Sequence, residues 1–186
     1  MEEKNLSKVF WTEALTGGLV IGVLLFVWDL IGYWLNMPLN GSGIASFVRF
    51  VILAGGIVVF CRRIRAFRGP ELGLSYGTAF GFILAMMLFT GIVAGIGQFF
   101  LQVVIAPDYF DEVYEMTLLN AAIPENLVEQ MLALRPMMKN PVVMILSGIF
   151  NYVIYGGLIG LIAAAFLKRP ADPFANNSSE DYNPGF

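Results

Sequence analysis

The sequence predicts an all-α integral membrane protein, in which four transmembrane helices form one bundle and two short amphipathic helices connect the third span to the fourth. Hydrophobic residues make up 58% of the 186 residues and charged residues only 13%, whereas a soluble domain carries about 25% charged residues. The mean hydropathy is +0.73, and four apolar runs approach or exceed the roughly 20 residues that cross a bilayer. We expect one membrane domain over residues 1–169 and a mobile cytoplasmic tail over 170–186.

The composition also limits the chemistry that is available to the chain. Histidine is absent, which removes the commonest catalytic base and metal ligand. The single cysteine, Cys61, excludes an internal disulfide and a cysteine-based zinc site. The net charge of −3 gives no indication of nucleic-acid binding. We therefore expect no catalytic residues, no metal, no cofactor and no nucleic-acid partner.

The first two spans, 14–35 and 44–61, are predicted to form a hairpin around a turn that is rich in proline and glycine. Asp29 is the only charge in the first span, and Arg49 is the only charge in the second. Because the two residues are placed symmetrically about the turn, they lie at the same depth, and we expect an ion pair between the helices. The alternative is that each is alone, with Arg49 extended to the headgroups and Asp29 at the aqueous interface.

The third span is predicted over 76–105, inside a stretch of 36 residues without charge between Glu71 and Asp108. Thirty helical residues extend over about 45 Å, which exceeds the ~30 Å hydrocarbon core. The helix must therefore tilt, kink near Gly95–Gly97, or project from the membrane.

Residues 107–140 form the one sizeable polar connection, and apolar residues recur in it at helical spacing. Asn120 is expected to end a first short helix, Pro124 to begin a second, and Pro136 to mark its exit. The connection contains six acidic residues, Asp108, Asp111, Glu112, Glu115, Glu125 and Glu129. Because they lack the spacing of a calcium-binding loop, we interpret them as a solvated face of helices that lie on the membrane or across the bundle mouth.

The fourth span is predicted over 141–167, with Asn151 and Tyr155 as candidates for a polar path. Basic residues at the ends of the spans indicate the orientation of the chain. One face carries eight of them: Lys4, Lys8, Arg62, Arg63, Arg65, Arg68, Lys168 and Arg169. The other face carries two, Arg135 and Lys139. The excess predicts that both termini are cytoplasmic, and the basic residues that follow spans two and four are also candidates for contact with lipid headgroups.

Glycine pairs at GxxxG spacing recur in three of the spans. They are Gly18 and Gly22, Gly77 and Gly81, Gly91 and Gly95, and Gly156 and Gly160. Small residues on one helical face allow backbones to approach closely in a membrane. The pattern predicts a tight bundle within the chain, with homo-oligomerisation as the alternative.

Three segments carry a resemblance to a known family. They are GLSYGTAFGFILAMMLFTGIVAGIGQFFLQVVIAPDYFDEVYE, which includes the third span, ENLVEQMLALRPMMKNP, and GGLIGLIAAAFLKRPADPF, which includes the end of the fourth. They resemble a bacterial family of short membrane proteins known as domain of unknown function 4199. The resemblance covers nearly the whole chain and is strongest over residues 72–174. It implies a four-helix integral membrane fold and supplies no catalytic residues.

Three classes of function are then open. The favoured one is a non-enzymatic structural or accessory subunit in the bacterial cytoplasmic membrane, which packs against itself or a larger assembly through glycine-rich helix faces. The second is a small oligomeric transporter or channel that uses Asp29 and the polar residues of the fourth span, since ionisable residues inside a membrane are functional candidates. The third is a membrane enzyme, which the shortage of reactive side chains disfavours.

Overall fold

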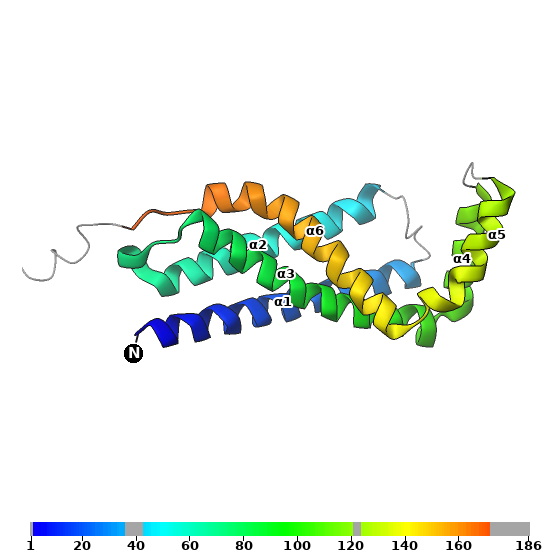
Figure 1. Cartoon of the computed structure of the whole chain (residues 1–186), viewed down its shortest axis with the longest axis horizontal. Helices are drawn as coiled ribbons and strands as arrows, with labels where there is room; N and C mark the ends of the chain where they lie inside the picture. The colour runs from blue at the N-terminus through cyan, green and yellow to red at the C-terminus, as the bar shows by residue number, and fades with distance from the viewer. Residues whose placement is uncertain (1, 36–42, 121–123, 172–186) are drawn as a thin grey trace, which may run out of the picture.

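A computed structural model describes residues 2–35, 43–120 and 124–171 of the chain (Figure 1). The elements are α1 (Glu2–Trp34), α2 (Gly43–Leu72), α3 (Tyr76–Phe99), the π-helical segment η1 (Phe100–Ile105), α4 (Pro107–Asn120), α5 (Glu125–Met138) and α6 (Pro141–Leu167). Four helical segments are long and apolar enough to cross a membrane: Leu6–Trp34, Gly43–Pro70, Tyr76–Ile105 and Pro141–Leu167. The predicted all-α membrane bundle is thus confirmed. The expected turn at 36–42 and the tail from 172 onward lie outside the described residues.

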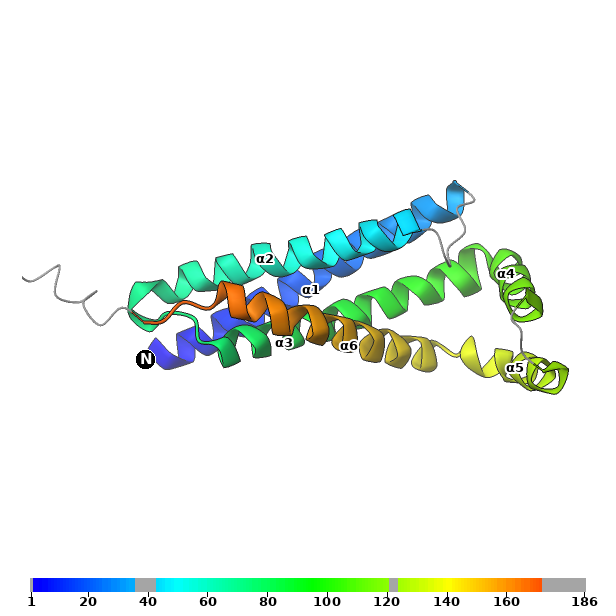
Figure 2. The same ribbon diagram turned by 90° about the horizontal axis from the view of Figure 1, so that it is seen from above.

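Helix α3 lies at the centre of the bundle and packs along both α1 and α6, while α2 lies against α1 and touches α6 less closely (Figures 1 and 2). The start of α1, the turn from α2 to α3 and the end of α6 gather at one end, which we call the terminal end. Helices α4 and α5 lie across the opposite end, roughly perpendicular to the long axis of the bundle (Figures 1 and 2). We call this the α4–α5 end.

The core lies where α1, α2 and α3 meet. Ile21 of α1, Ile57 of α2, and Phe82 and Met86 of α3 are fully buried. Helix α6 contributes chiefly small residues to its contacts and leaves large apolar side chains such as Phe166 exposed. In a membrane this exposed face meets lipid, which is as apolar as the side chains themselves.

Close helix contacts depend on glycine at six of the eight positions named above. A Cβ atom built on Gly91 would lie 2.6 Å from Ile149 Cα, and one built on Gly95 would lie 2.7 Å from Ile145 Cα, so α3 meets the backbone of α6 there. The other four face side chains or backbone of the neighbouring helix: Gly18 and Gly22 of α1 face α3, and Gly156 and Gly160 of α6 face Met87 and Ile83 of α3.

The remaining pair, Gly77 and Gly81, does not mediate a helix contact among the described residues. No atom lies within 4 Å of a Cβ built on either glycine, so the predicted packing within the bundle is wrong for this pair, while contact with a second copy of the chain stays a prediction. Spacing places two glycines on one face of a helix, but it does not say which way that face points. The face of α6 that contacts α3 also includes Gly148. The GxxxG pattern did not predict it, because the residues four positions away on either side, Met144 and Tyr152, are large.

Two helices extend beyond the predicted spans. Helix α1 begins at Glu2, well before residue 14. Helix α2 continues past Cys61 to Leu72, so Arg62, Arg63, Arg65 and Arg68 lie on a helix and not in a loop. Arginine is a good helix former, and the regular conformation is first broken at Gly69, where φ is 68°.

The turn from α2 to α3 is tied to the end of α6. Backbone N–H groups of Leu74 and Arg169 each donate to the other residue's carbonyl oxygen, at 2.8 and 2.9 Å. Gly73 has φ of 57°, and a Cβ there would lie 2.6 Å from the Arg169 carbonyl oxygen. Only glycine fits both this backbone conformation and the space that is available. Arg68 Nε also donates a hydrogen bond to the Gly73 carbonyl oxygen at 2.8 Å.

The third span does not kink at Gly95–Gly97. Regular α-helix continues to Phe99, because Gly95 packs against α6 and Gly97 against Phe26 of α1. The irregularity comes at η1, where the Ala106 N–H donates to the Leu101 carbonyl oxygen at 3.0 Å. This wider turn is typical of a π-bulge, and it leads directly into α4.

The start of α6 has a clear local cause. Asn140 caps the helix, because its side chain accepts a hydrogen bond from the Val142 N–H at 2.9 Å, and Pro141 occupies the first turn. Helix α5 differs from expectation near its end, since it continues through Pro136 to Met138. A proline this close to a helix end removes one hydrogen bond without ending the helix.

Candidate functional site

The structure brings Asp29 and Arg49 together, from α1 and α2. Arg49 donates from Nη2 to Asp29 Oδ1 at 2.6 Å and from Nε to the same oxygen at 3.2 Å. The Asp29 side chain is 9% exposed and the Arg49 side chain 32% exposed. A single charge costs roughly 2.5–3.5 kcal/mol on insertion scales at the centre of a membrane helix, and less toward its ends. Pairing on adjacent helices offsets part of the cost that remains.

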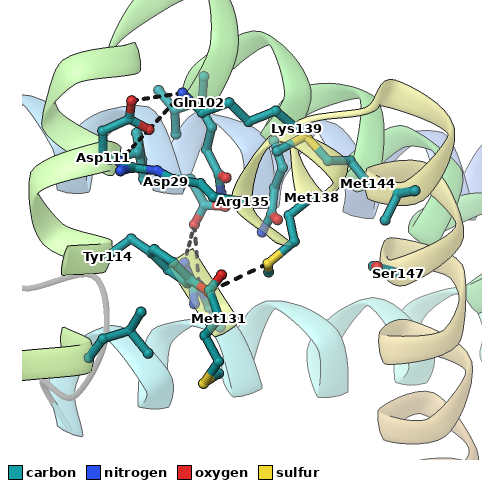
Figure 3. Close-up of a pocket in the computed structure, with 16 residues that line it drawn as sticks. Asp29, Gln102, Asp111, Tyr114, Met131, Arg135, Met138, Lys139, Met144 and Ser147 are labelled. Atoms are coloured by element: carbon teal, nitrogen blue, oxygen red, sulfur yellow. Dashed lines mark hydrogen bonds and ion pairs between the residues drawn. The ribbon is translucent and has the colours of Figure 1, made fainter. Parts of the chain in front are cut away.

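A cavity of about 520 Å³ extends from this ion pair to α4 and α5 (Figure 3). Asp29 and Arg49 line it from α1 and α2, Gln98 and Gln102 from α3 and η1, and Ser147 from α6. The remainder of the wall includes apolar side chains such as Met131, Met138 and Met144, and Figure 3 shows them around the same space. This volume is within the usual range for small-molecule sites.

Charged residues of α4 and α5 form the rim of the cavity. Lys139 Nζ and Arg135 Nη2 each lie 2.7 Å from Asp111 Oδ1. Arg135 Nη1 also donates to Glu115 Oε1 at 2.8 Å, and its guanidinium carbon lies 5.8 Å from the centre of the Tyr114 ring. These contacts join the two helices across the end of the bundle. The acidic face predicted here is therefore partly paired, while Asp108, Glu112 and Glu129 are exposed to solvent.

The bonds to Asp111 change its acidity. Burial raises the pKa of this carboxyl, but hydrogen bonds from Lys139 and Arg135 and the charges of both outweigh that effect and hold the pKa below its ordinary value of 3.8. Asp111 is thus ionised at neutral pH, and the rim keeps its charges.

Toward the terminal end, the ion pair is followed by apolar side chains in both helices. One helical turn beyond Asp29 lies Leu25, and one turn beyond Arg49 lies Leu53; they are 1% and 6% exposed. Among the described residues, the buried polar residues besides Asp29 are Thr90 and Glu13. Thr90 donates to the carbonyl oxygen of Met86 in its own helix at 3.0 Å. The described residues therefore form no continuous polar path from the ion pair to the terminal end.

A second cavity, of about 310 Å³, lies between α2 and α6. Asn151 and Tyr155, the candidates for a polar path, line this second cavity and not the first. Arg49, Gln98 and Ser147 line both cavities. The two spaces therefore meet at these three polar side chains, a junction that sequence reasoning missed because it depends on how α3 and α6 cross.

With this geometry established, the chain can be compared with known proteins. A model of the family described as "Protein of unknown function (DUF4199)" matches residues 16–169. The chain belongs to the DUF4199 family. Comparison with curated proteins and with solved structures gave no match. The match includes nearly all of the four spans and both cavities, so the site described here lies within the family's shared region.

This DUF4199 chain has a further ion pair at the terminal end. Arg63 Nε lies 2.9 Å from Glu13 Oε2, and the Glu13 side chain is only 8% exposed. Sequence reasoning missed the pair because Glu13 precedes the first apolar run, although Glu13 and Arg63, like Asp29 and Arg49, are placed symmetrically about the turn. Arg62 and Lys168 are exposed at the same end. The described residues contain no group of three or more His, Cys, Asp or Glu side chains arranged to hold a metal ion.

Proposed function

We propose that this DUF4199 protein is a non-enzymatic accessory protein of the membrane that binds a polar ligand in the cavity at its α4–α5 end. The observation that carries the proposal is that the polar lining of the cavity does not continue along the bundle to the terminal end, since Leu25 and Leu53 follow the Asp29–Arg49 ion pair in α1 and α2. A cavity with charged and amide side chains that does not cross the bundle suits binding. A channel needs a polar route that continues to the other side.

The basis for an accessory role is the cavity, not the glycine faces. Gly18, Gly91 and Gly95 are occupied by contacts within the chain, so their faces are not free for a partner. A homo-oligomer or a larger assembly would have to use other surfaces, of which the exposed apolar face of α6 is one candidate.

We further propose that the protein lies in the bacterial cytoplasmic membrane with both termini in the cytoplasm. The positive-inside rule supports this orientation, since eight of the Lys and Arg residues flank the spans on the terminal side and two on the other. The cavity then opens toward the outside of the membrane, beneath α4 and α5.

Ligand binding and flux measurements on the purified protein test the role. The probes are glycerol 3-phosphate, phosphoethanolamine and short-chain phospholipids, and each is added to the wild type and to two variants. Ser147→Trp fills the cavity, whereas Leu146→Trp changes a neighbouring side chain that is exposed and does not line it. We expect at least one probe to raise the melting temperature of the wild type and of Leu146→Trp but not of Ser147→Trp.

The proposal fails if no probe stabilises the wild type, or if the protein in liposomes conducts cations or protons. A flux that Asp29→Asn abolishes would favour the alternative function, a small transporter or channel that uses Asp29 and the polar residues of α6.

A further inference from the structure

We propose that the ligand is an anionic phospholipid that enters from the side, with its phosphate at the junction of the two cavities, its headgroup in the larger cavity and an acyl chain in the smaller one. This inference rests on the proposed ligand-binding function. It adds the chemical class of the ligand and its orientation.

The junction offers the groups that a phosphate needs. Arg49 uses Nη2 and Nε for Asp29, and its Nη1 makes no hydrogen bond within the described part of the chain. Gln98 contributes an amide and Ser147 a hydroxyl to the same junction. Arginine is well suited to phosphate because its fixed array of N–H donors matches the phosphate oxygens.

The charges of the larger cavity favour an anionic headgroup over a zwitterionic one. Three cationic side chains line it, Arg49, Arg135 and Lys139, against two anionic ones, Asp29 and Asp111. Glu115, the second partner of Arg135, lies outside the lining and is 54% exposed, so water and salt screen its charge. The lining therefore has an excess of one positive charge, which one phosphodiester would neutralise. Gln102 then remains to bind the hydroxyl groups of an uncharged headgroup.

The smaller cavity has a mixed wall with more apolar than polar surface, and it is open to lipid. Phe50, Leu53 and Ile159 contribute apolar side chains beside the polar groups of Ser46 and Asn151. Phe50 and Tyr155 are 53% and 57% exposed at its edge. Helices α2 and α6, between which it lies, touch less closely than α3 and α6 do. A chain can therefore enter here from the bilayer, without passing α4 and α5.

The depth of Arg49 agrees with this orientation. The span Gly43–Pro70 has 28 residues, so it extends over about 42 Å and exceeds the ~30 Å hydrocarbon core by about 12 Å. With that excess shared between both ends, Arg49 lies roughly 3 Å below the headgroup boundary. A phosphate reaches this level with a small local displacement of the lipid.

The test is lipid binding to the purified, delipidated protein, measured by native mass spectrometry with phosphatidylglycerol and phosphatidylethanolamine of identical acyl chains. We expect the wild type to retain one phosphatidylglycerol with a preference of about fivefold, since one cationic side chain near the surface contributes ~1 kcal/mol to binding an anionic lipid. Lys139→Gln removes the excess charge and should lose the preference, whereas Lys168→Gln at the terminal end should keep it.

A second pair of variants tests the chain cavity. Asn151→Trp fills it, whereas Ile154→Trp places the same side chain on a neighbouring exposed position that lines neither cavity. We expect bound phosphatidylglycerol to be lost in Asn151→Trp and kept in Ile154→Trp. Equal effects of the two tryptophans, or no preference in the wild type, would overturn the inference.

Soluble probes separate this failure from that of the broader proposal. One outcome is that glycerol 3-phosphate binds to the wild type but not to Ser147→Trp, and that neither lipid is preferred. The cavity then binds a soluble anion, and only the lipid inference is wrong. Should no soluble probe and no lipid bind, both proposals fall together.

Discussion

Gly148 of α6 lies directly against Gly91 of α3: a Cβ built on Gly148 would come within 2.6 Å of the Gly91 carbonyl oxygen. The backbone of one helix is thus in contact with the backbone of the other. Because this crossing is so close, it places Ser147, the neighbour of Gly148, on the wall of the same cavities as Gln98 of α3. The packing of two glycines therefore determines where the two cavities join.

The first prediction concerns this crossing. A Cβ on Gly95 would lie 2.7 Å from Ile145 Cα and 3.0 Å from the Met144 carbonyl oxygen. Backbone atoms cannot move aside as a flexible side chain does, so we expect Gly95→Ala to lower the free energy of unfolding by about 1–3 kcal/mol, the usual cost of overpacking. Thermal unfolding in detergent measures the loss.

Gly81→Ala is the matched control, because it adds the same methyl group to the same helix where no atom lies within 4 Å. We expect it to unfold at or slightly above the wild-type temperature, because alanine favours the helical conformation more than glycine does. Equal losses of unfolding free energy in the two variants would mean that alanine disturbs the α3 helix itself and not its contact with α6.

The second prediction concerns the rim. Asp111 has a lower pKa in the folded protein than its ordinary value of 3.8, which an unfolded chain retains. Between the two pKa values, the unfolded state therefore binds more protons than the folded state does. The ion pairs of Asp111 thus contribute fully to the free energy of unfolding above pH 3.8, and this contribution is lost as the pH falls through the lowered pKa of the folded state. We expect α4 and α5 to separate only below pH 3.8.

Spin labels measure this separation. With Cys61 replaced by serine, nitroxides on Glu112→Cys and Gln130→Cys report the distance between two exposed positions of α4 and α5. Asp111→Asn should show the longer distance already at neutral pH, because the amide cannot pair with Lys139 and Arg135. A distance that changes well above pH 3.8 would contradict the assignment to Asp111.

The sequence was informative where a feature depends on nearby residues. The apolar runs predicted four spans, and the symmetric placement of Asp29 and Arg49 about a short turn was enough to place them at one depth. Local rules also predicted α4 and α5, since their apolar residues keep helical spacing and Asn120 and Pro124 mark their limits.

The features that sequence reasoning missed depend on how distant helices are rotated against each other. Glycine spacing did not distinguish Gly77 and Gly81, which face open space, from Gly91 and Gly95, which face α6. The junction at Arg49, Gln98 and Ser147 likewise depends on how α2, α3 and α6 are rotated against one another. No local pattern encodes such rotations.

The third prediction concerns orientation. Asn126 on α5 and Ala66 on α2 are both exposed and lie at opposite ends of the bundle. In intact cells we expect a membrane-impermeant thiol reagent to label Asn126→Cys and to leave Ala66→Cys unlabelled until the membrane is broken, with Cys61 replaced by serine in both. Labelling of Ala66→Cys alone would reverse the proposed orientation.

The last prediction concerns Asp29 and Arg49. Asp29→Asn leaves a guanidinium without its partner, and Arg49→Gln leaves a carboxylate that is 9% exposed without one. Breaking a buried pair costs more than replacing both members, so each single variant should lower the free energy of unfolding and the double variant should regain part of the loss. We expect a coupling energy of about 1–3 kcal/mol from the double-mutant cycle.

The cycle also separates a structural ion pair from two independent charges. If Arg49 were held by lipid headgroups and Asp29 by water, the two substitutions would act independently and the coupling energy would be near zero, despite the 2.6 Å contact. Ser46→Ala is a suitable control, because Ser46 lines the smaller cavity one turn before Arg49 and has no bond to Asp29 among the described residues. Combined with Asp29→Asn, it should give additive losses, since the coupling is specific to the guanidinium.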